Sequence, residues 1–166
     1  MQKIIFSFVL LLTATVAFSQ VDSAIAPPYK RFPVVPPFRL LTPDSSSVFT
    51  KTDLKKNRPV LIILFSPECE HCRRETEDII KHIDDFEKIQ IVMATTMPFD
   101  KMKQFYTDYQ LARHKNITVG KDIQYLLPVY YDIRSLPFLA FYDRKGKLIE
   151  AFEGSLSVEK MLTRFE

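Results

Sequence analysis

The sequence predicts one α/β domain in three layers, with a mixed central sheet that carries helices on both faces. Two observations predict this class. The apolar runs Val60–Phe65 and Gln90–Ala94 have the length and composition of buried strands, and segments with helical periodicity follow them. The region from Phe138 to the C-terminus then has the pattern strand, turn, strand, helix. The order strand, helix, strand, helix, hairpin, helix gives a sheet with parallel and antiparallel members.

Composition restricts the class of protein further. The chain has 166 residues, of which 46% are hydrophobic, enough for one domain with a sizeable core. The net charge is only +3 and acidic and basic residues are interspersed, so we expect no nucleic-acid partner. The three glycines are too few for glycine-rich phosphate loops. We expect a monomer, with no internal repeat and no second domain.

Residues 1–19 have the pattern of an export signal. Lys3 supplies a positive charge, Ile4–Ala17 is a short apolar region, and Ala17-Phe18-Ser19 fits a cleavage site of the small-x-small type. The apolar region is shorter than the ~20 residues of a membrane-spanning helix. We therefore expect an exported protein, periplasmic or secreted, that starts at Gln20. An uncleaved N-terminal anchor is the alternative.

The next segments lead into the domain. Residues 20–36 are rich in proline and predict an extended, irregular leader, so the domain is expected to span 37–166. Phe38–Leu41 and Val48–Thr50 predict an N-terminal hairpin extension of the sheet. A short turn of helix at Thr52–Leu54 is expected before the first apolar strand.

The only two cysteines, Cys69 and Cys72, are separated by two residues at the point where the first apolar strand becomes a helix. This is the place and form of a dithiol redox site. Helix positions three apart have Cβ atoms roughly 5–6 Å from each other, near enough for a disulfide after small adjustment. Unpaired N–H groups and the positive end of the helix dipole favour a thiolate at Cys69. We interpret Cys69 as the nucleophile and Cys72 as the resolving thiol, and His71 tunes Cys69 if it is protonated or donates a hydrogen bond.

A purely structural disulfide is the alternative for this pair. A bridge that closes so short a loop removes little chain entropy and stabilises weakly, which favours a chemical use. Export to an oxidising compartment makes the disulfide persistent unless it is reduced. The redox group is then the Cys69–Cys72 disulfide itself, and neither a bound cofactor nor a metal is required.

The helix after Cys69 is expected to reach about Phe86. Glu75 falls at the edge of its apolar stripe, next to Cys72. A partly desolvated carboxylate there suits proton exchange with the resolving thiol. The alternative is a boundary glutamate that pairs with a basic residue. The stripe itself comprises Cys72, Thr76, Ile79, Ile80, Ile83 and Phe86.

The remaining elements follow from periodicity and turn signals. In chain order they are a strand at Gln90–Ala94, a helix at Phe99–Leu111, a short strand at Ile117–Val119, a brief helical segment at Asp122–Leu127 stopped by Pro128, a hairpin of Phe138–Tyr142 and Lys147–Phe152, and a last helix with Val158, Met161, Leu162 and Phe165 on one face.

From about Pro37 to its end, the sequence resembles thioredoxin-fold proteins of the TlpA/ResA type, which are exported bacterial thiol-disulfide oxidoreductases. Three features carry the resemblance. The first is the apolar strand followed by Cys69-Glu70-His71-Cys72-Arg73-Arg74-Glu75, and the second is Ser135-Leu136-Pro137 before a strand, turn and strand. The third is Pro37-Phe38-Arg39-Leu40 together with Asp53-Leu54.

The resemblance implies roles for several residues. It implies that Pro137 has a cis peptide bond and lies against the dithiol, so that the backbone at Leu136 can pair with a bound substrate chain. A trans proline that opens an edge strand is the alternative from the residues alone. Glu75 matches a glutamate of the family, which favours its proton-handling role. The expected partners are protein thiols or disulfides of the cell envelope and a separate redox partner.

The sequence also departs from the family pattern. The chain has no tryptophan, Glu68 stands before the first cysteine, Glu70-His71 replaces the common glycine-proline, and Phe138 replaces a threonine. The family suggests a reductant while His71 suggests a more oxidising protein, so the direction of electron flow stays open. Two other functions remain: a copper metallochaperone that uses both thiolates and a histidine, and a redox-inactive binding protein of the same fold.

Overall fold

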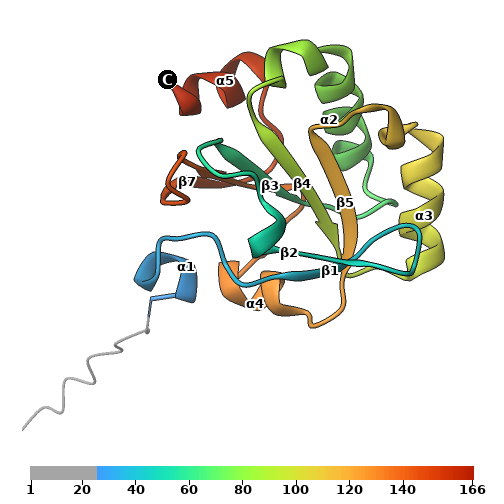
Figure 1. Cartoon of the computed structure of the whole chain (residues 1–166), viewed down its shortest axis with the longest axis horizontal. Helices are drawn as coiled ribbons and strands as arrows, with labels where there is room; N and C mark the ends of the chain where they lie inside the picture. Colours follow the sequence, from blue (N-terminus) through green and yellow to red (C-terminus); the bar gives the residue numbers. More distant parts are fainter. Residues whose placement is uncertain (1–25) are drawn as a thin grey trace, which may run out of the picture.

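The computed structural model describes residues 26–166, so the predicted signal at 1–19 and the start of the leader lie outside the described residues. A seven-stranded sheet with the order β2-β1-β5-β4-β3-β6-β7 forms the centre of the domain (Figure 1). Its strands are β1 (Arg39–Leu41), β2 (Val48–Thr50), β3 (Val60–Leu64), β4 (Gln90–Thr95), β5 (Ile117–Asp122), β6 (Phe138–Tyr142) and β7 (Leu148–Glu153).

The sheet is mixed, as predicted. β3 pairs with β4, and β4 with β5, in parallel, while β6 is antiparallel to both β3 and β7. The predicted N-terminal hairpin is also present: β1 pairs with β2 and joins the sheet through an antiparallel contact with β5. All five residues of β3 are buried, because helices cover both of its faces.

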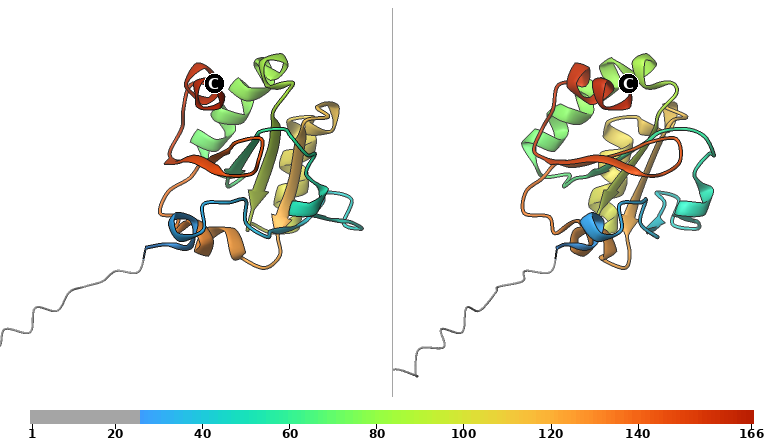
Figure 2. Two further views of the ribbon diagram at one scale, coloured as in Figure 1. Left: turned by 60° about the vertical axis from the view of Figure 1, so that its left-hand side comes forward. Right: turned by 90° about the vertical axis from the view of Figure 1, so that its left-hand side faces the viewer.

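The helices divide into two outer layers. Along β3, Leu61 and Ile63 belong to the apolar cluster under α2, α3 and α5, while Val60, Ile62 and Leu64 belong to the cluster under α1 and α4. The alternation of side chains along a strand thus builds two cores from one sequence run. Both views of Figure 2 place α1 beside α4, away from α5. The helices are α1 (Pro28–Arg31), α2 (Glu70–Lys81), α3 (Phe99–Asp108), α4 (Leu126–Tyr131) and α5 (Val158–Leu162).

Two helices end earlier than the periodicity predicts. α2 stops at Lys81, and a 3-10 turn at Ile83–Phe86 continues its apolar stripe so that Phe86 is still buried. α3 stops at Asp108 because Gln110 adopts the left-handed conformation with φ of 51° before a second 3-10 turn begins at Leu111. Further 3-10 turns lie at Lys51–Asp53, close to the predicted turn of helix, and at Thr163–Phe165.

The predicted helical segment at Asp122–Leu127, stopped by Pro128, is wrong. β5 continues to Asp122, and α4 starts at Leu126 with Pro128 inside its first turn. Proline is tolerated there, because the first N–H groups of a helix have no acceptor within the helix. The buried Asp122 carboxylate instead accepts hydrogen bonds from Leu127 N–H (2.8 Å) and Gln124 N–H (3.1 Å), which ties the strand to the start of the helix.

The predicted leader is extended only in part. Pro28–Arg31 forms α1, and Pro28 at its first position has the backbone angle that a helix start requires. Val34 bridges to Lys147, and Val35 is buried among the apolar side chains around β1 and β3. The Tyr130 hydroxyl donates to the carbonyls of Phe32 and Val34. Apolar side chains of the leader therefore find a place on the domain that a proline count does not reveal.

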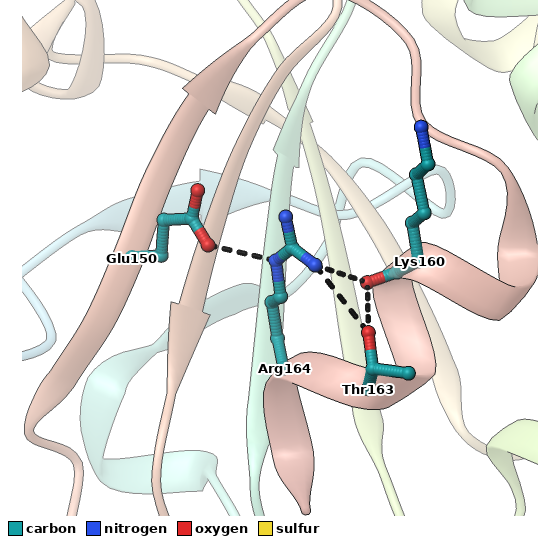
Figure 3. A network of polar contacts seen from close by, with 4 residues as sticks. All are labelled: Glu150, Lys160, Thr163 and Arg164. Carbon is teal, nitrogen blue, oxygen red and sulfur yellow. Dashed lines mark hydrogen bonds and ion pairs between the residues drawn. The ribbon is translucent and has the colours of Figure 1, made fainter.

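The C-terminal segment is held to β7 by a polar network (Figure 3). Arg164 Nε donates to Glu150 Oε2 at 2.7 Å, and Arg164 Nη1 donates to the Lys160 carbonyl at 3.1 Å. This network ties the end of the chain, from α5 onward, to β7.

Candidate dithiol active site

Cys69 lies where the chain leaves β3 and enters α2, as predicted. It is the residue that caps the helix: its Sγ accepts a hydrogen bond from Cys72 N–H at 3.3 Å. Such a sulfur faces unpaired N–H groups and the positive end of the helix dipole, which favours negative charge on it. Cys69 is partly exposed whereas Cys72 is 1% exposed, and both are free thiols. The outer sulfur is therefore accessible to another molecule, and the inner one is not.

The surroundings of Cys72 hold it in the thiol form. Burial, together with the hydrogen bond to Cys69 and the nearby charge of Glu75, raises the pKa of Cys72 to about 12. The inner thiol needs a proton acceptor before it can attack a disulfide.

Glu75 lies one helical turn after Cys72 and is more buried than predicted. Its side chain is 4% exposed rather than at a half-buried edge, because the loop before α5 folds over it. Both carboxylate oxygens accept the Leu156 N–H, at 3.3 and 3.2 Å. Burial raises the pKa of Glu75 to about 7, although the hydrogen bonds from Leu156 and Ser155 act in the opposite direction. A carboxyl group with this pKa exchanges protons near neutral pH.

The other wall of the site is the segment before β6. The Leu136–Pro137 peptide bond is cis, as the resemblance implies, and the pairing of this backbone with a substrate chain stays a prediction. β6 pairs with β3 through Phe138 and Leu64, which brings this segment to the end of β3 where Cys69 begins α2. The Cys69 thiol donates to the Leu136 carbonyl with an S···O distance of 3.8 Å. Leu136 and Pro137 therefore lie at the outer sulfur.

A groove of about 500 Å³ opens beside Cys69. Its walls are mostly apolar, with hydroxyl groups and one arginine at its border. The lining residues are Leu64, Phe65, Cys69, Ala94, Thr95, Thr96, Pro128, Ile133, Arg134, Ser135 and Leu136.

His71 lies on the exposed side of α2. Arg74 Nη2 donates to its Nδ1 at 3.4 Å and lies 3.4 Å from Glu70 Oε1. Within residues 26–166, His71 makes no hydrogen bond to Cys69 or Cys72. The structure does not bring His71 into contact with the sulfurs, and its tuning role stays a prediction.

One residue at the site escaped the sequence analysis. Glu153 at the end of β7 accepts hydrogen bonds from Arg134 N–H and Ser135 Oγ, both at 3.1 Å. No pattern in the sequence predicts that an exposed glutamate at the end of a strand will bind the backbone and side chain of residues 134 and 135.

Residues 26–166 contain no group of three or more His, Cys, Asp or Glu side chains arranged to hold a metal ion. No helix in this part of the chain is both long and apolar enough to cross a bilayer.

Comparisons with known proteins place this geometry in a family. No curated protein matches the chain in sequence. Among solved structures, StoA from Bacillus subtilis is 16% identical, with a TM-score of 0.60, over 81% of this chain and 99% of its own. A secreted Mycobacterium tuberculosis disulfide oxidoreductase homologous to E. coli DsbE is 19% identical, with a TM-score of 0.62, over 76% of this chain and 92% of its own. DsbF from MTB is 20% identical, with a TM-score of 0.64, over 76% and 91%.

At these identities the solved structures show a shared fold. The model of the thioredoxin-like domain family matches residues 50–166, which include both cysteines, Glu75 and the cis-proline. This match covers more than half of the chain, so the chain belongs to the thioredoxin-like domain family.

Proposed function

We propose that this protein is a thiol-disulfide oxidoreductase that exchanges disulfides with exported protein substrates through Cys69-Glu70-His71-Cys72. One observation carries the proposal: a partly exposed sulfur caps α2 beside a cis-proline, with a buried thiol directly behind it. The similar fold of a secreted M. tuberculosis disulfide oxidoreductase supports the same class. The pattern of residues 1–19 supports export.

The reaction has two exchange steps. The Cys69 thiolate bonds to one sulfur of a substrate disulfide, the substrate S–S bond breaks, and the departing thiolate takes a proton. Cys72 then loses its proton and attacks Cys69 Sγ, which breaks the mixed disulfide and releases the second substrate thiolate. The substrate gains two electrons, the Cys69–Cys72 pair loses two, and a dithiol partner restores the reduced pair. The same steps in reverse oxidise a substrate dithiol.

Glu75 is the proposed proton acceptor for the second step. A thiol whose pKa is about 12 does not ionise unaided at neutral pH, whereas Glu75, with a pKa of about 7, is partly ionised there. Its place one turn along α2 and its burial favour proton transfer with Cys72 over exchange with solvent.

Leu136 and Pro137 are the proposed substrate-binding residues. Leu136 borders both the outer sulfur and the groove, and the cis bond to Pro137 follows it, so an extended substrate segment can lie there with its disulfide against Cys69. The apolar lining of the groove suits the apolar side chains of an unfolded or partly folded protein.

Trapping and turnover test the proposal together. We expect Cys72→Ser, which keeps the nucleophile and removes the resolving thiol, to form mixed disulfides with exported proteins. A reductant should cleave these mixed disulfides. Cys69→Ser is the matched control and should trap none. The wild type should reduce insulin with dithiothreitol as the electron source, and both variants should not. Failure of both trapping and insulin reduction would refute the proposal, and a redox titration of the pair would give the direction of electron flow.

A further inference from the structure

We infer that Glu153 is a positioning residue that holds the substrate-binding backbone at Leu136 against Cys69. The inference rests on the proposed function, because it assigns a purpose to the order of that backbone. It concerns a side chain that touches neither cysteine.

The segment 134–136 lacks the support that neighbouring segments have. These residues belong to no strand or helix, and within the described part of the chain they make no backbone-to-backbone hydrogen bond. Yet this segment borders the groove and carries the carbonyl that accepts the Cys69 thiol. Something other than sheet pairing must fix its position.

The end of β7 supplies that support from both sides of Leu136. Before Leu136, the two carboxylate oxygens of Glu153 accept from Arg134 N–H and Ser135 Oγ, each at 3.1 Å. After Leu136, Gly154 N–H donates to the Pro137 carbonyl at 2.8 Å. Glu153, the last residue of β7, and Gly154, which follows it, therefore clamp the chain on both sides of the Leu136 carbonyl that faces the sulfur. Hydrogen bonds to an ionised carboxylate are stronger than neutral ones.

The position of Glu153 on the sheet makes the clamp rigid. Glu153 pairs with Phe138 in the β6–β7 ladder, so its backbone is fixed relative to the strand that follows the cis-proline. Three residues later, Leu156 N–H binds Glu75. The segment 153–156 thus touches both walls of the dithiol site, the proton-handling carboxylate and the substrate-binding backbone.

Steady-state reduction of insulin tests this role. Loss of the clamp should weaken substrate binding and leave the chemistry at the sulfurs intact. We expect Glu153→Ala to raise KM for insulin by about three- to tenfold, the effect of losing one or two hydrogen bonds, with kcat within about twofold of wild type. Glu153→Gln should restore KM, because its amide oxygen accepts Arg134 N–H and its NH₂ donates to Ser135 Oγ.

Glu150→Ala is the matched control, because Glu150 lies on the same strand but binds Arg164 and not the 134–136 segment. It should leave KM unchanged. Amide exchange at Arg134, followed by NMR, gives a readout independent of turnover: it should accelerate in Glu153→Ala and not in Glu150→Ala. An active wild type with an unchanged KM in Glu153→Ala would overturn the inference, as would unchanged exchange at Arg134. A wild type that does not reduce insulin would count against the proposed function instead, and the exchange measurement would still decide the role of Glu153.

Discussion

The two sulfurs of the site lie one helical turn apart but have opposite environments. Cys69 caps α2 at the protein surface, whereas Cys72 points into the core and has a pKa raised to about 12 by burial. Alkylating agents react with thiolates, so this difference should appear directly in reaction rates.

We therefore expect iodoacetamide at pH 7 to modify Cys69 in the folded, reduced protein and to modify Cys72 at least about 100-fold more slowly, since its thiolate is scarce and covered. Mass spectrometry of peptides from quenched time points measures both rates. Cys69→Ser controls for modification of the first thiol and should leave Cys72 slow. In urea the two cysteines should react alike, and similar rates in the folded protein would contradict the buried position of Cys72.

The burial of Glu75 makes stability depend on pH. The pKa of Glu75 is about 7 in the folded protein and 4.5 ordinarily, so the unfolded chain releases this proton at lower pH than the folded one. Below pH 4.5 the group is protonated in both states and has no effect. As pH rises from 4.5 to 7 the fold loses stability, by on the order of 3 kcal/mol once both states are ionised.

Glu75→Gln removes this penalty. Its free energy of unfolding relative to wild type should be near zero at pH 4 and higher by on the order of 3 kcal/mol at pH 8. Urea unfolding across this range measures the difference, with Glu77→Gln, an exposed position on α2, as the control for charge removal. A variant less stable than wild type at pH 8 would show that the hydrogen bonds of the carboxylate outweigh its desolvation.

The local pattern predicts the dithiol at Cys69 and Cys72, and the family resemblance predicts the cis bond at Pro137, but neither predicts how deeply Glu75 is buried. A helical wheel places Glu75 at the edge of the stripe, because it takes account of α2 alone. The loop that buries this carboxylate comes from Leu156, far along the chain, and no periodicity within α2 reports it. The same limit explains Glu153, whose partners at 134 and 135 are set by strand pairing between β6 and β7.

At the scale of elements, strands with continuous apolar runs are predictable and boundaries set by single contacts are not. β3 and β4 follow from composition because both of their faces are buried. The start of α4 depends on the buried Asp122 carboxylate, which accepts a hydrogen bond from Leu127 N–H. Pro128 therefore lies in the first turn of a helix and does not end one, as its position in the sequence alone would suggest.

The contact between β1 and β5 also depends on a single residue, Gly120. A Cβ atom at Gly120 would lie 2.7 Å from Leu40 Cβ and 3.0 Å from the Leu41 carbonyl oxygen. Both neighbours lie in β1, the strand of the hairpin that pairs with β5, where Leu40 is buried and Leu41 is half-buried. Only a residue without a side chain allows this approach.

Gly120→Ala should therefore lower the free energy of unfolding by about 1–3 kcal/mol, the usual cost of overpacking a core. Urea denaturation measures it. Thr118→Ala on the same strand, which shortens a half-buried side chain and adds no atom, is the control. A change within about 0.5 kcal/mol for Gly120→Ala would mean that the hairpin moves away from β5 without cost.

For the whole molecule, the two ends of the described chain close opposite faces of the sheet. The C-terminal segment is tied to β7 through Arg164 and Glu150, and the segment 26–36 covers the face under α4. Tyr29 packs against Tyr131 and Phe138, with ring centroids 5.8 and 6.5 Å apart. The segment expected to be a leader therefore completes one of the two cores.

This predicts a stability difference between two truncated proteins, one that starts at residue 26 and one that starts at residue 37. The shorter protein loses the buried Val35 and the two carbonyls that accept the Tyr130 hydroxyl. We expect it to be less stable by at least about 2 kcal/mol, because burial of Val35 and one Tyr130 hydrogen bond alone amount to this. The Tyr29 ring contacts and the backbone hydrogen bonds from Val35 N–H to Gly146 and from Leu148 N–H to Pro33 are lost as well. Tyr130→Phe should cost about 1 kcal/mol in the longer protein and nothing in the shorter one, where the acceptors are missing. If Tyr130→Phe lowered the free energy of unfolding equally in the longer and the shorter protein, the hydroxyl would stabilise the domain through other partners. The hydrogen bonds from Tyr130 to Phe32 and Val34 would then not hold the segment 26–36 in place.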